Sequence, residues 1–185
     1  MLGRRLARAA AASDAAFTRA SASSYDHFST ARVASIDVEA RERDWAGGLQ
    51  AVGLELRRAL AQGFSPAELG EQLAETRRSL GQAGKPRTSP ALADAIVDSI
   101  GRHLVFTAPG DPTATIAYLA RIRLQDVNDA FRTAWGKPDR LIFVSHNRPL
   151  PRAEAAIRAA WSSGFNAPDR APRSPRAAAG AQPDE

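Results

Sequence analysis

The sequence predicts an α+β fold, with a mostly antiparallel sheet and helices packed on one face of that sheet. Residues Ala34 to Ala40 alternate apolar and polar side chains, which is typical of a strand with one buried face. Further along the chain, apolar residues recur every three or four positions behind capping signals, which predicts amphipathic helices. A short apolar run, Leu141–Val144, then predicts a buried strand that returns to the sheet.

The composition indicates one domain followed by a tail. The chain has 185 residues, 44% of them hydrophobic, which is enough for a packed core. Because no run reaches the roughly 18 apolar residues of a membrane span, we expect no membrane partner. The absence of cysteine excludes disulfides, thiolate zinc ligands and cysteine nucleophiles. We assign residues 1–150 to the domain and residues 151–185 to a short helix and a disordered tail of Arg, Pro and Ala.

The first forty residues predict a helix followed by a strand pair. Leu2, Leu6 and Ala9 lie at helical spacing, so we expect a surface helix near the start of the chain. This region has no apolar core of a secretory signal. Residues 15–40 then predict a β-hairpin, in which the second strand has the more regular alternation.

A long helix is expected after the hairpin. Asp44 is its predicted N-cap and Gly63 its predicted stop. Gly47, Gly48 and Gly53 each weaken a helix by about 1 kcal/mol relative to Ala. They therefore require compensation by packing, or allow close approach to a neighbouring segment. The apolar stripe of this helix is Trp45, Leu49, Val52, Leu56 and Leu60.

Two capping signals predict the next helices. Ser65 and Glu68 form a capping box around Pro66, and the loop after that helix is expected at Gly81–Arg87. Ser89, before Pro90, is expected to cap a helix that ends at Gly101. The inner faces of these helices are expected to be Leu69, Leu73, Thr76 and Leu80, and then Leu92, Ile96 and Ile100.

Three further helices are expected in the second half of the chain. One begins at Asp111-Pro112, one ends at Gly136, and one spans Pro151 to Trp161. Arg123 occupies the N-cap of the second of these, where a hydroxyl would be favourable, so its start should be weakened by about 1 kcal/mol. The inner faces of the first two are expected to be Ile116, Leu119 and Ala120, and then Val127, Ala130, Phe131 and Ala134.

Five phrases in this order resemble the insulinase (pitrilysin) family of zinc metallopeptidases, the inverzincins. The resemblance covers residues 2–145 and is greatest for the C-terminal-type domain of that family, with the opening strands of the domain missing. It therefore resembles a metallopeptidase-like α/β domain truncated at its N-terminal side. The five phrases are Glu55–Leu69, Thr88–Asp94, Val105–Pro109, Leu124–Asn128 and Leu141–Ser145.

The resemblance implies a non-catalytic role. Members of the family enclose peptides in a chamber between two halves, and their zinc site lies in the N-terminal-type domain on the motif H-x-x-E-H. The C-terminal-type domain lacks the metal and contributes chamber wall and peptide contacts. The resemblance therefore implies no cofactor in this chain, a zinc-bearing peptidase domain or subunit as partner, and extended peptides as ligands. Bacterial members are often exported to the periplasm.

The histidines do not supply the missing zinc motif. None of His27, His103 and His146 begins H-x-x-E-H, and no two of them lie at helical ligand spacing. Ser24 to His27 do not form a catalytic group either, because adjacent residues on a strand point to opposite faces. Gly81–Lys85 lacks the spacing of a phosphate-binding loop. We assign no catalytic or metal-binding residue, and expect a fragment or split subunit that is inactive alone.

Two alternatives stay open. The net charge is +5, from 25 basic and 20 acidic residues, which could indicate a small nucleic-acid-binding protein that uses residues 167–185. The basic residues are spread along the chain and often stand beside acids, as in Arg41–Asp44, so this partner is disfavoured. The other alternative is a stand-alone module that binds extended peptides along an open sheet edge.

Overall fold

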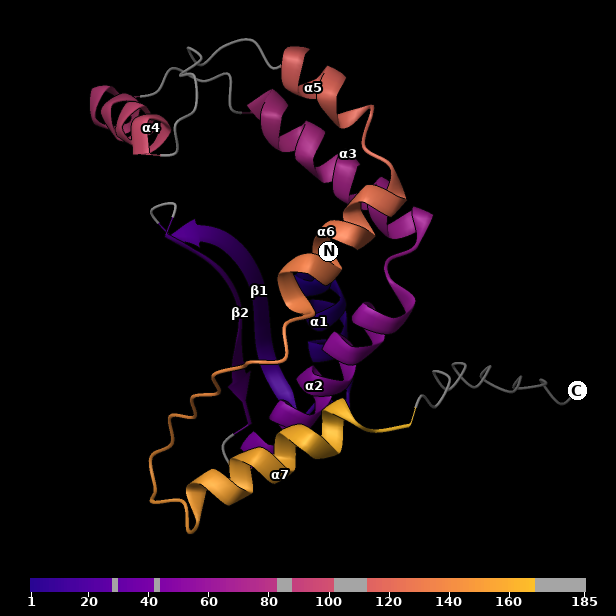
Figure 1. Cartoon of the computed structure of the whole chain (residues 1–185), viewed down its shortest axis with the longest axis vertical. Coiled ribbons are helices and arrows are strands. Elements are labelled where there is room, and N and C mark those ends of the chain that lie inside the picture. The colour runs from indigo at the N-terminus through magenta and orange to yellow at the C-terminus, as the bar shows by residue number, and fades with distance from the viewer. Residues whose placement is uncertain (28–29, 42–43, 83–87, 102–112, 169–185) are drawn as a thin grey trace, which may run out of the picture.

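The computed structural model describes residues 1–27, 30–41, 44–82, 88–101 and 113–168. Its strands form an antiparallel pair, and several helices accompany them, which confirms the predicted α+β class (Figure 1). Along the chain, the elements are α1 (Leu2–Ala10), β1 (Phe17–His27), β2 (Ala31–Ala40), α2 (Trp45–Gln62), α3 (Pro66–Gln82), α4 (Ser89–Gly101), α5 (Thr113–Leu119), α6 (Leu124–Trp135) and α7 (Ala153–Phe165).

The hairpin has one apolar face and one polar face, as its sequence predicts. Ala22 lies opposite Ile36 in the register, and both pack against the core. The next pair, Ser23 and Ser35, points the other way, and their hydroxyl oxygens lie 2.9 Å apart. The strand period of two separates these faces, so helices α1 and α2 cover the apolar face alone (Figure 1).

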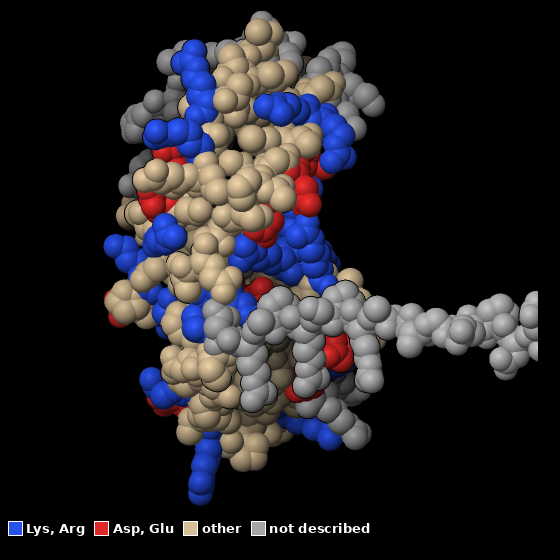
Figure 2. Space-filling model, turned by 90° about the vertical axis from the view of Figure 1, so that its right-hand side faces the viewer, with Lys and Arg blue, Asp and Glu red and all other residues tan. Residues whose placement is uncertain are grey.

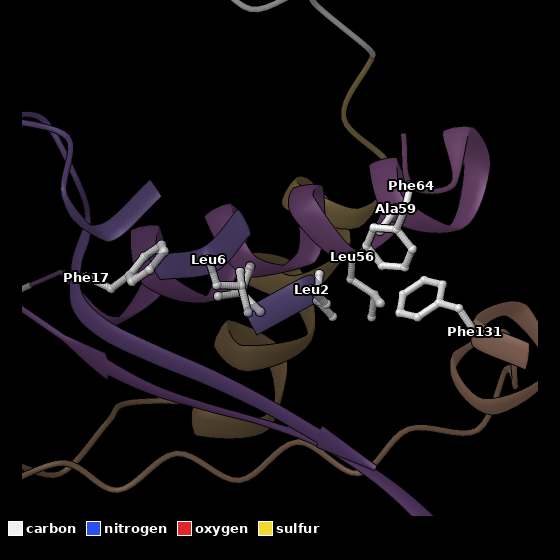
Figure 3. Close-up of a cluster of buried hydrophobic side chains, with 8 residues drawn as sticks. Leu2, Leu6, Phe17, Leu56, Ala59, Phe64 and Phe131 are labelled. Atoms are coloured by element: carbon white, nitrogen blue, oxygen red, sulfur yellow. The ribbon is translucent and has the colours of Figure 1, made fainter. Parts of the chain in front are cut away.

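The centre of the core lies between α1, α2 and the start of β1. Leu6 is fully buried and Leu2 is 4% exposed, so the stripe predicted for this surface helix is the side of α1 that faces the core (Figure 3). Burial of each such side chain contributes about 1.5–3 kcal/mol. The outer side of α1 carries its arginines, which explains why its amphipathic pattern was visible in the sequence. The core cluster is Leu2, Leu6, Phe17, Val52, Leu56, Ala59, Phe64 and Phe131.

Helix α2 begins and packs as its sequence indicates. The Asp44 carboxylate accepts a hydrogen bond of 3.0 Å from the Gly47 backbone N–H, which confirms the predicted N-cap. The glycines allow close approach to neighbours. A Cβ atom at Gly48 would lie 3.1 Å from the Ala40 Cβ, and one at Gly53 would lie 3.2 Å from the Phe165 backbone nitrogen. Packing against β2 and α7 therefore compensates for their weak helix propensity.

A tight turn joins α2 to α3. Gly63 has φ of 72°, in the left-handed region that favours glycine. The Phe64 backbone N–H donates to Asn128 Oδ1 at 2.7 Å, and this bond connects the turn to α6. Ser65 and Glu68 form the predicted capping box, with bonds of 2.8 and 3.3 Å between each backbone N–H and the other side chain.

The later helices confirm some of the predicted boundaries and shift others, since the helix predicted over Pro151–Trp161 is α7 at Ala153–Phe165. Helix α3 runs to Gln82, and the rest of the predicted loop at Gly81–Arg87 lies outside the described residues, as does Asp111-Pro112. Helix α4 ends at Gly101 as predicted, but Thr88 is its cap, since the Thr88 carbonyl accepts from the Leu92 N–H at 3.0 Å.

The start of α6 has more support than its N-cap residue suggests. The Asp126 carboxylate accepts from the Arg123 backbone N–H at 3.3 Å and from the Arg123 guanidinium at 2.8 Å. Asp126, at the third helical position, therefore accepts from the backbone N–H of the N-cap residue, although the Arg123 side chain itself has no acceptor for the N–H groups of the first turn.

The prediction that Leu141–Val144 forms a buried strand of the sheet is wrong. Within the described residues the sheet holds β1 and β2 alone, and residues 141–146 lie in no strand. Leu141 is 97% exposed and Phe143 is 87% exposed. Residues 136–152 instead form a long connection from α6 to α7 that passes beside the sheet (Figure 1). An apolar run indicated burial, but nothing in the described chain covers the outer face of this segment.

Candidate partner-binding surface

The most unusual surface of the molecule is the segment Leu141–Ser145, which we call the docking strand. Ile142 and Val144 are half-buried, whereas Leu141, Phe143 and Ser145 are exposed. This alternation is that of a strand, in which successive side chains point to opposite faces. The segment thus presents one face to the molecule and an apolar face to solvent.

The backbone of the docking strand is also unpaired. Among the described residues, no backbone-to-backbone hydrogen bond involves positions 141–145. Extended backbone with free N–H and C=O groups is a template for pairing with another strand. The surface therefore combines unpaired backbone groups with exposed apolar side chains.

Arg140 fixes the beginning of the docking strand. Its guanidinium lies over the Phe165 ring, 4.6 Å from the centroid, and 5.8 Å from the Trp161 ring centroid. It also donates to the Trp135 carbonyl at 3.3 Å. These contacts connect the strand to both α6 and α7, and cation–π contacts of this kind contribute about 0.5–1 kcal/mol or more. Sequence reasoning did not single out Arg140, because aromatic residues on a later helix give no local signal.

A turn ends the docking strand. The Arg148 backbone N–H donates to His146 Nδ1 at 3.0 Å. Pro149 and Pro151 follow, and proline cannot donate to a strand ladder. The extended segment is consequently bounded at both ends by contacts and residues that limit its length.

Helices α4 and α5 carry further exposed apolar side chains. Val97 and Ile100 on α4 are each 68% exposed, as is Tyr118 on α5. Ile100 and Ile116 were expected on inner faces, but Ile100 is exposed and Ile116 is 37% exposed, while Leu119 is buried. Exposed apolar patches of this kind indicate contact with another molecule.

Arg5 on α1 and Glu68 on α3 form a half-buried ion pair that joins the two helices. Arg5 donates to both carboxylate oxygens of Glu68, at 2.5 and 2.7 Å, and to the Gly63 carbonyl at 2.8 Å. The Arg5 hydrogen bonds, opposed by burial, lower the pKa of Glu68 from 4.5 to about 2. A carboxylate so low in pKa and so fully bonded acts as a structural anion, not as a general acid or base.

Of the three histidine side chains, the structure describes that of His146, which lies in the turn after the docking strand. The His27 side chain and His103 lie outside the described residues, so the absence of a shared histidine site stays a prediction. In the described ranges, no three His, Cys, Asp or Glu side chains are grouped for a metal ion. Asp26, once considered beside Ser24, accepts a hydrogen bond of 2.8 Å from Arg32.

A shallow hollow lies between the hairpin and the end of α6. It has a volume of about 330 Å³ and is open to solvent. The charged side chains that line this hollow are of both signs, and Asp26 already bonds to Arg32. The hollow therefore has no electrostatic potential of one sign that would attract a charged ligand. Its lining residues are Asp26, Thr30, Ala31, Arg32, Thr133, Ala134 and Lys137.

The arginines are dispersed over the described surface. Figure 2 shows Lys and Arg side chains spread over one face with Asp and Glu among them. Exposed pairs of this kind are solvated and contribute about 0–1 kcal/mol each. On this face the basic side chains stand among carboxylates, whereas nucleic acid binding requires a clustered basic patch. The arginines in ion pairs are Arg4, Arg5, Arg8, Arg19, Arg32, Arg58, Arg78, Arg123, Arg132 and Arg158.

Comparisons with known proteins identify no relative of this chain, since no family model, curated protein or solved structure matches it. None of the helices in the described ranges has the length and apolarity of a membrane span.

Proposed function

We propose that this chain is a non-catalytic domain or fragment of an insulinase-like zinc metallopeptidase that acts with a zinc-bearing partner domain or subunit. The observation that carries the proposal is the docking strand, an exposed apolar segment at 97% and 87% exposure for Leu141 and Phe143. An apolar segment that the described chain leaves uncovered supports a domain that is completed by a partner. The ordered resemblance of five sequence phrases to that family supports the same reading.

The residue types of the chain also favour a non-catalytic role, in which it contributes chamber wall and peptide contacts. Its three histidines include no H-x-x-E-H motif, and it has no cysteine. Catalytic zinc requires three converging ligands and an open position for water. We therefore propose that zinc and the catalytic glutamate come from the partner, while this chain contributes chamber wall and contacts to extended peptides.

Reconstitution tests the proposed function. The chain would be co-expressed with the product of a neighbouring reading frame that encodes H-x-x-E-H, and cleavage of a fluorogenic peptide would be measured. We expect cleavage by the mixture at least tenfold above either component alone, and loss of cleavage with a zinc chelator. Stoichiometric zinc in the isolated chain, or peptide cleavage by it that depends on His27, His103 or His146, would contradict the proposal.

A further inference from the structure

We infer that the docking strand, Leu141–Ser145, binds an extended segment of another chain that is apolar at alternating positions and acidic at both flanks. The inference stands apart from the peptidase assignment, because any partner with such a segment would satisfy it.

The shape of the docking strand favours pairing with an extended segment. Its side chains alternate between half-buried and exposed, and its backbone groups are unpaired among the described residues. A strand of five residues spans about 17 Å, enough for a short ladder of hydrogen bonds. Such strand addition obtains affinity from main-chain bonds and selectivity from alternate side chains.

The docking strand is held in this extended form before any partner arrives. At one end, Arg140 bonds to the Trp135 carbonyl and stacks over the Phe165 ring. At the other end, the Arg148 N–H bonds to His146. A segment that is already ordered loses less conformational entropy on binding, so its affinity for an extended partner is higher than that of a flexible loop.

The exposed side chains specify an apolar partner face. Leu141 and Phe143 lie on the same side of the strand and are 97% and 87% exposed. Side chains at alternate positions of a paired strand meet those directly opposite, and aromatic or β-branched partners are favoured there. The partner therefore needs apolar, preferably β-branched, residues at alternate positions.

The charges around the docking strand specify acidic flanks. Between residues 137 and 152 there are four basic residues and one acidic residue, Asp139. The basic residues are Lys137 and Arg140 before the strand and Arg148 and Arg152 after it. Because the Arg140 guanidinium already lies over the Phe165 ring, Lys137 is the exposed basic residue before the strand. An acidic residue on each side of the partner's apolar core would be attracted by these groups.

The same charges disfavour a second copy of this chain as the partner. Two docking strands paired with each other would bring their basic flanks together, and like charges across a strand pair are destabilising. Basic residues and prolines beside an apolar strand are also the means by which proteins prevent self-association of an exposed edge.

A peptide-binding measurement tests the inference. The full chain would be titrated into fluorescein-labelled Glu-Glu-Val-Thr-Val-Thr-Glu-Glu, and fluorescence anisotropy would be recorded. The matched probe is Lys-Lys-Val-Thr-Val-Thr-Lys-Lys, and a third peptide carries N-methyl groups that remove its backbone donors. The variants are Phe143→Ser and, as a control at another exposed apolar position, Tyr118→Ser.

We expect the acidic-flanked peptide to bind at least tenfold more tightly than the basic-flanked one, and more weakly as salt is added. Phe143→Ser and N-methylation should each weaken binding about tenfold, while Tyr118→Ser changes it less than twofold. Equal binding of the two peptides, equal effects of the two variants, or no detectable binding would overturn the inference. So would a dimer of the free chain that Phe143→Ser dissociates, because a second copy would then occupy the strand.

Discussion

At the residue scale, a few polar contacts join segments that are far apart in the sequence. Arg5 on α1 bonds to Glu68 on α3, and Asn128 on α6 bonds to the Phe64 backbone. The capping box at Ser65 could be predicted because its residues are neighbours in sequence. The partners of Arg5 and Asn128 could not, since their contacts form only once the helices pack together.

The Arg5–Glu68 pair predicts a dependence of stability on acid. The pKa of Glu68 is about 2 in the folded chain, below its ordinary value of 4.5. The pair therefore stabilises the fold above pH 4.5, and this contribution is lost as the pH falls toward 2. Relative to Glu68→Gln, the unfolding free energy of the wild type should fall by about 1–2 kcal/mol more over that range, after allowance for partial exposure.

Urea unfolding at several pH values measures this difference. The control is Glu154→Gln, because the Glu154 side chain is 85% exposed and pairs with Arg158 on its own helix. Its pH dependence should follow that of the wild type. Identical pH dependence for Glu68→Gln and the wild type would show that the pair is not a stabilising contact.

Glycine at the α2–α3 turn gives a second prediction. An Ala side chain at Gly63 would require φ of 72° and place its Cβ 2.8 Å from Asn128 Cγ. We expect Gly63→Ala to lower the unfolding free energy by about 2 kcal/mol. Gly70→Ala is the matched control, because Gly70 lies within α3 with open space around it and Ala should stabilise that helix by about 0.5–1 kcal/mol. Thermal unfolding that changed equally in both variants would contradict this account of the turn.

At the element scale, helices with clear capping signals were predicted correctly from the sequence, whereas the position of Leu141–Val144 was not. The hairpin, α2, α3 and α6 were predicted because alternation, capping residues and terminal glycines are local signals. Leu141–Val144 was expected in the sheet because four apolar residues in succession indicate burial. Such a run indicates burial but does not say whether the chain itself or another molecule covers it.

The contact between α2 and α7 depends on a glycine in α7. A Cβ at Gly164 would lie 2.0 Å from the Gln50 backbone oxygen, and backbone cannot move aside as a flexible side chain can. Gly164→Ala should therefore lower the unfolding free energy by about 1–3 kcal/mol. Ser163→Ala, on the exposed side of the same helix, should change it by less than about 0.5 kcal/mol. Denaturant unfolding compares the two, and equal midpoints would rule out the close packing described.

Exposure of Phe143 gives a fourth prediction. Phe143→Ser should leave the unfolding free energy within about 0.5 kcal/mol of the wild type, because this side chain is 87% exposed. Phe131→Ala should cost about 3–5 kcal/mol, because Phe131 is 9% exposed and packs edge-on against Phe64. A large loss of stability in Phe143→Ser, measured by calorimetry, would place that residue in the core after all.

At the scale of the whole molecule, the described chain has a small core and a sheet of two strands. Helices α1 and α2 cover the apolar face of β1 and β2, while the docking strand and the outer faces of α4 and α5 expose apolar side chains. Amphipathic patterns in the sequence identified those faces but could not say that they stay exposed in this chain. A partner that covers them is the physical basis of the proposed function.

Amide hydrogen exchange of the free chain tests most directly whether the docking strand is unpaired. We expect amides of residues 141–145 to be protected less than about tenfold, and those amides of residues 33–38 in β2 whose N–H groups donate to β1 to be protected at least about a thousandfold. Slow exchange of residues 141–145, equal to that of β2, would mean that this segment is already paired within the chain and has no edge to offer a partner.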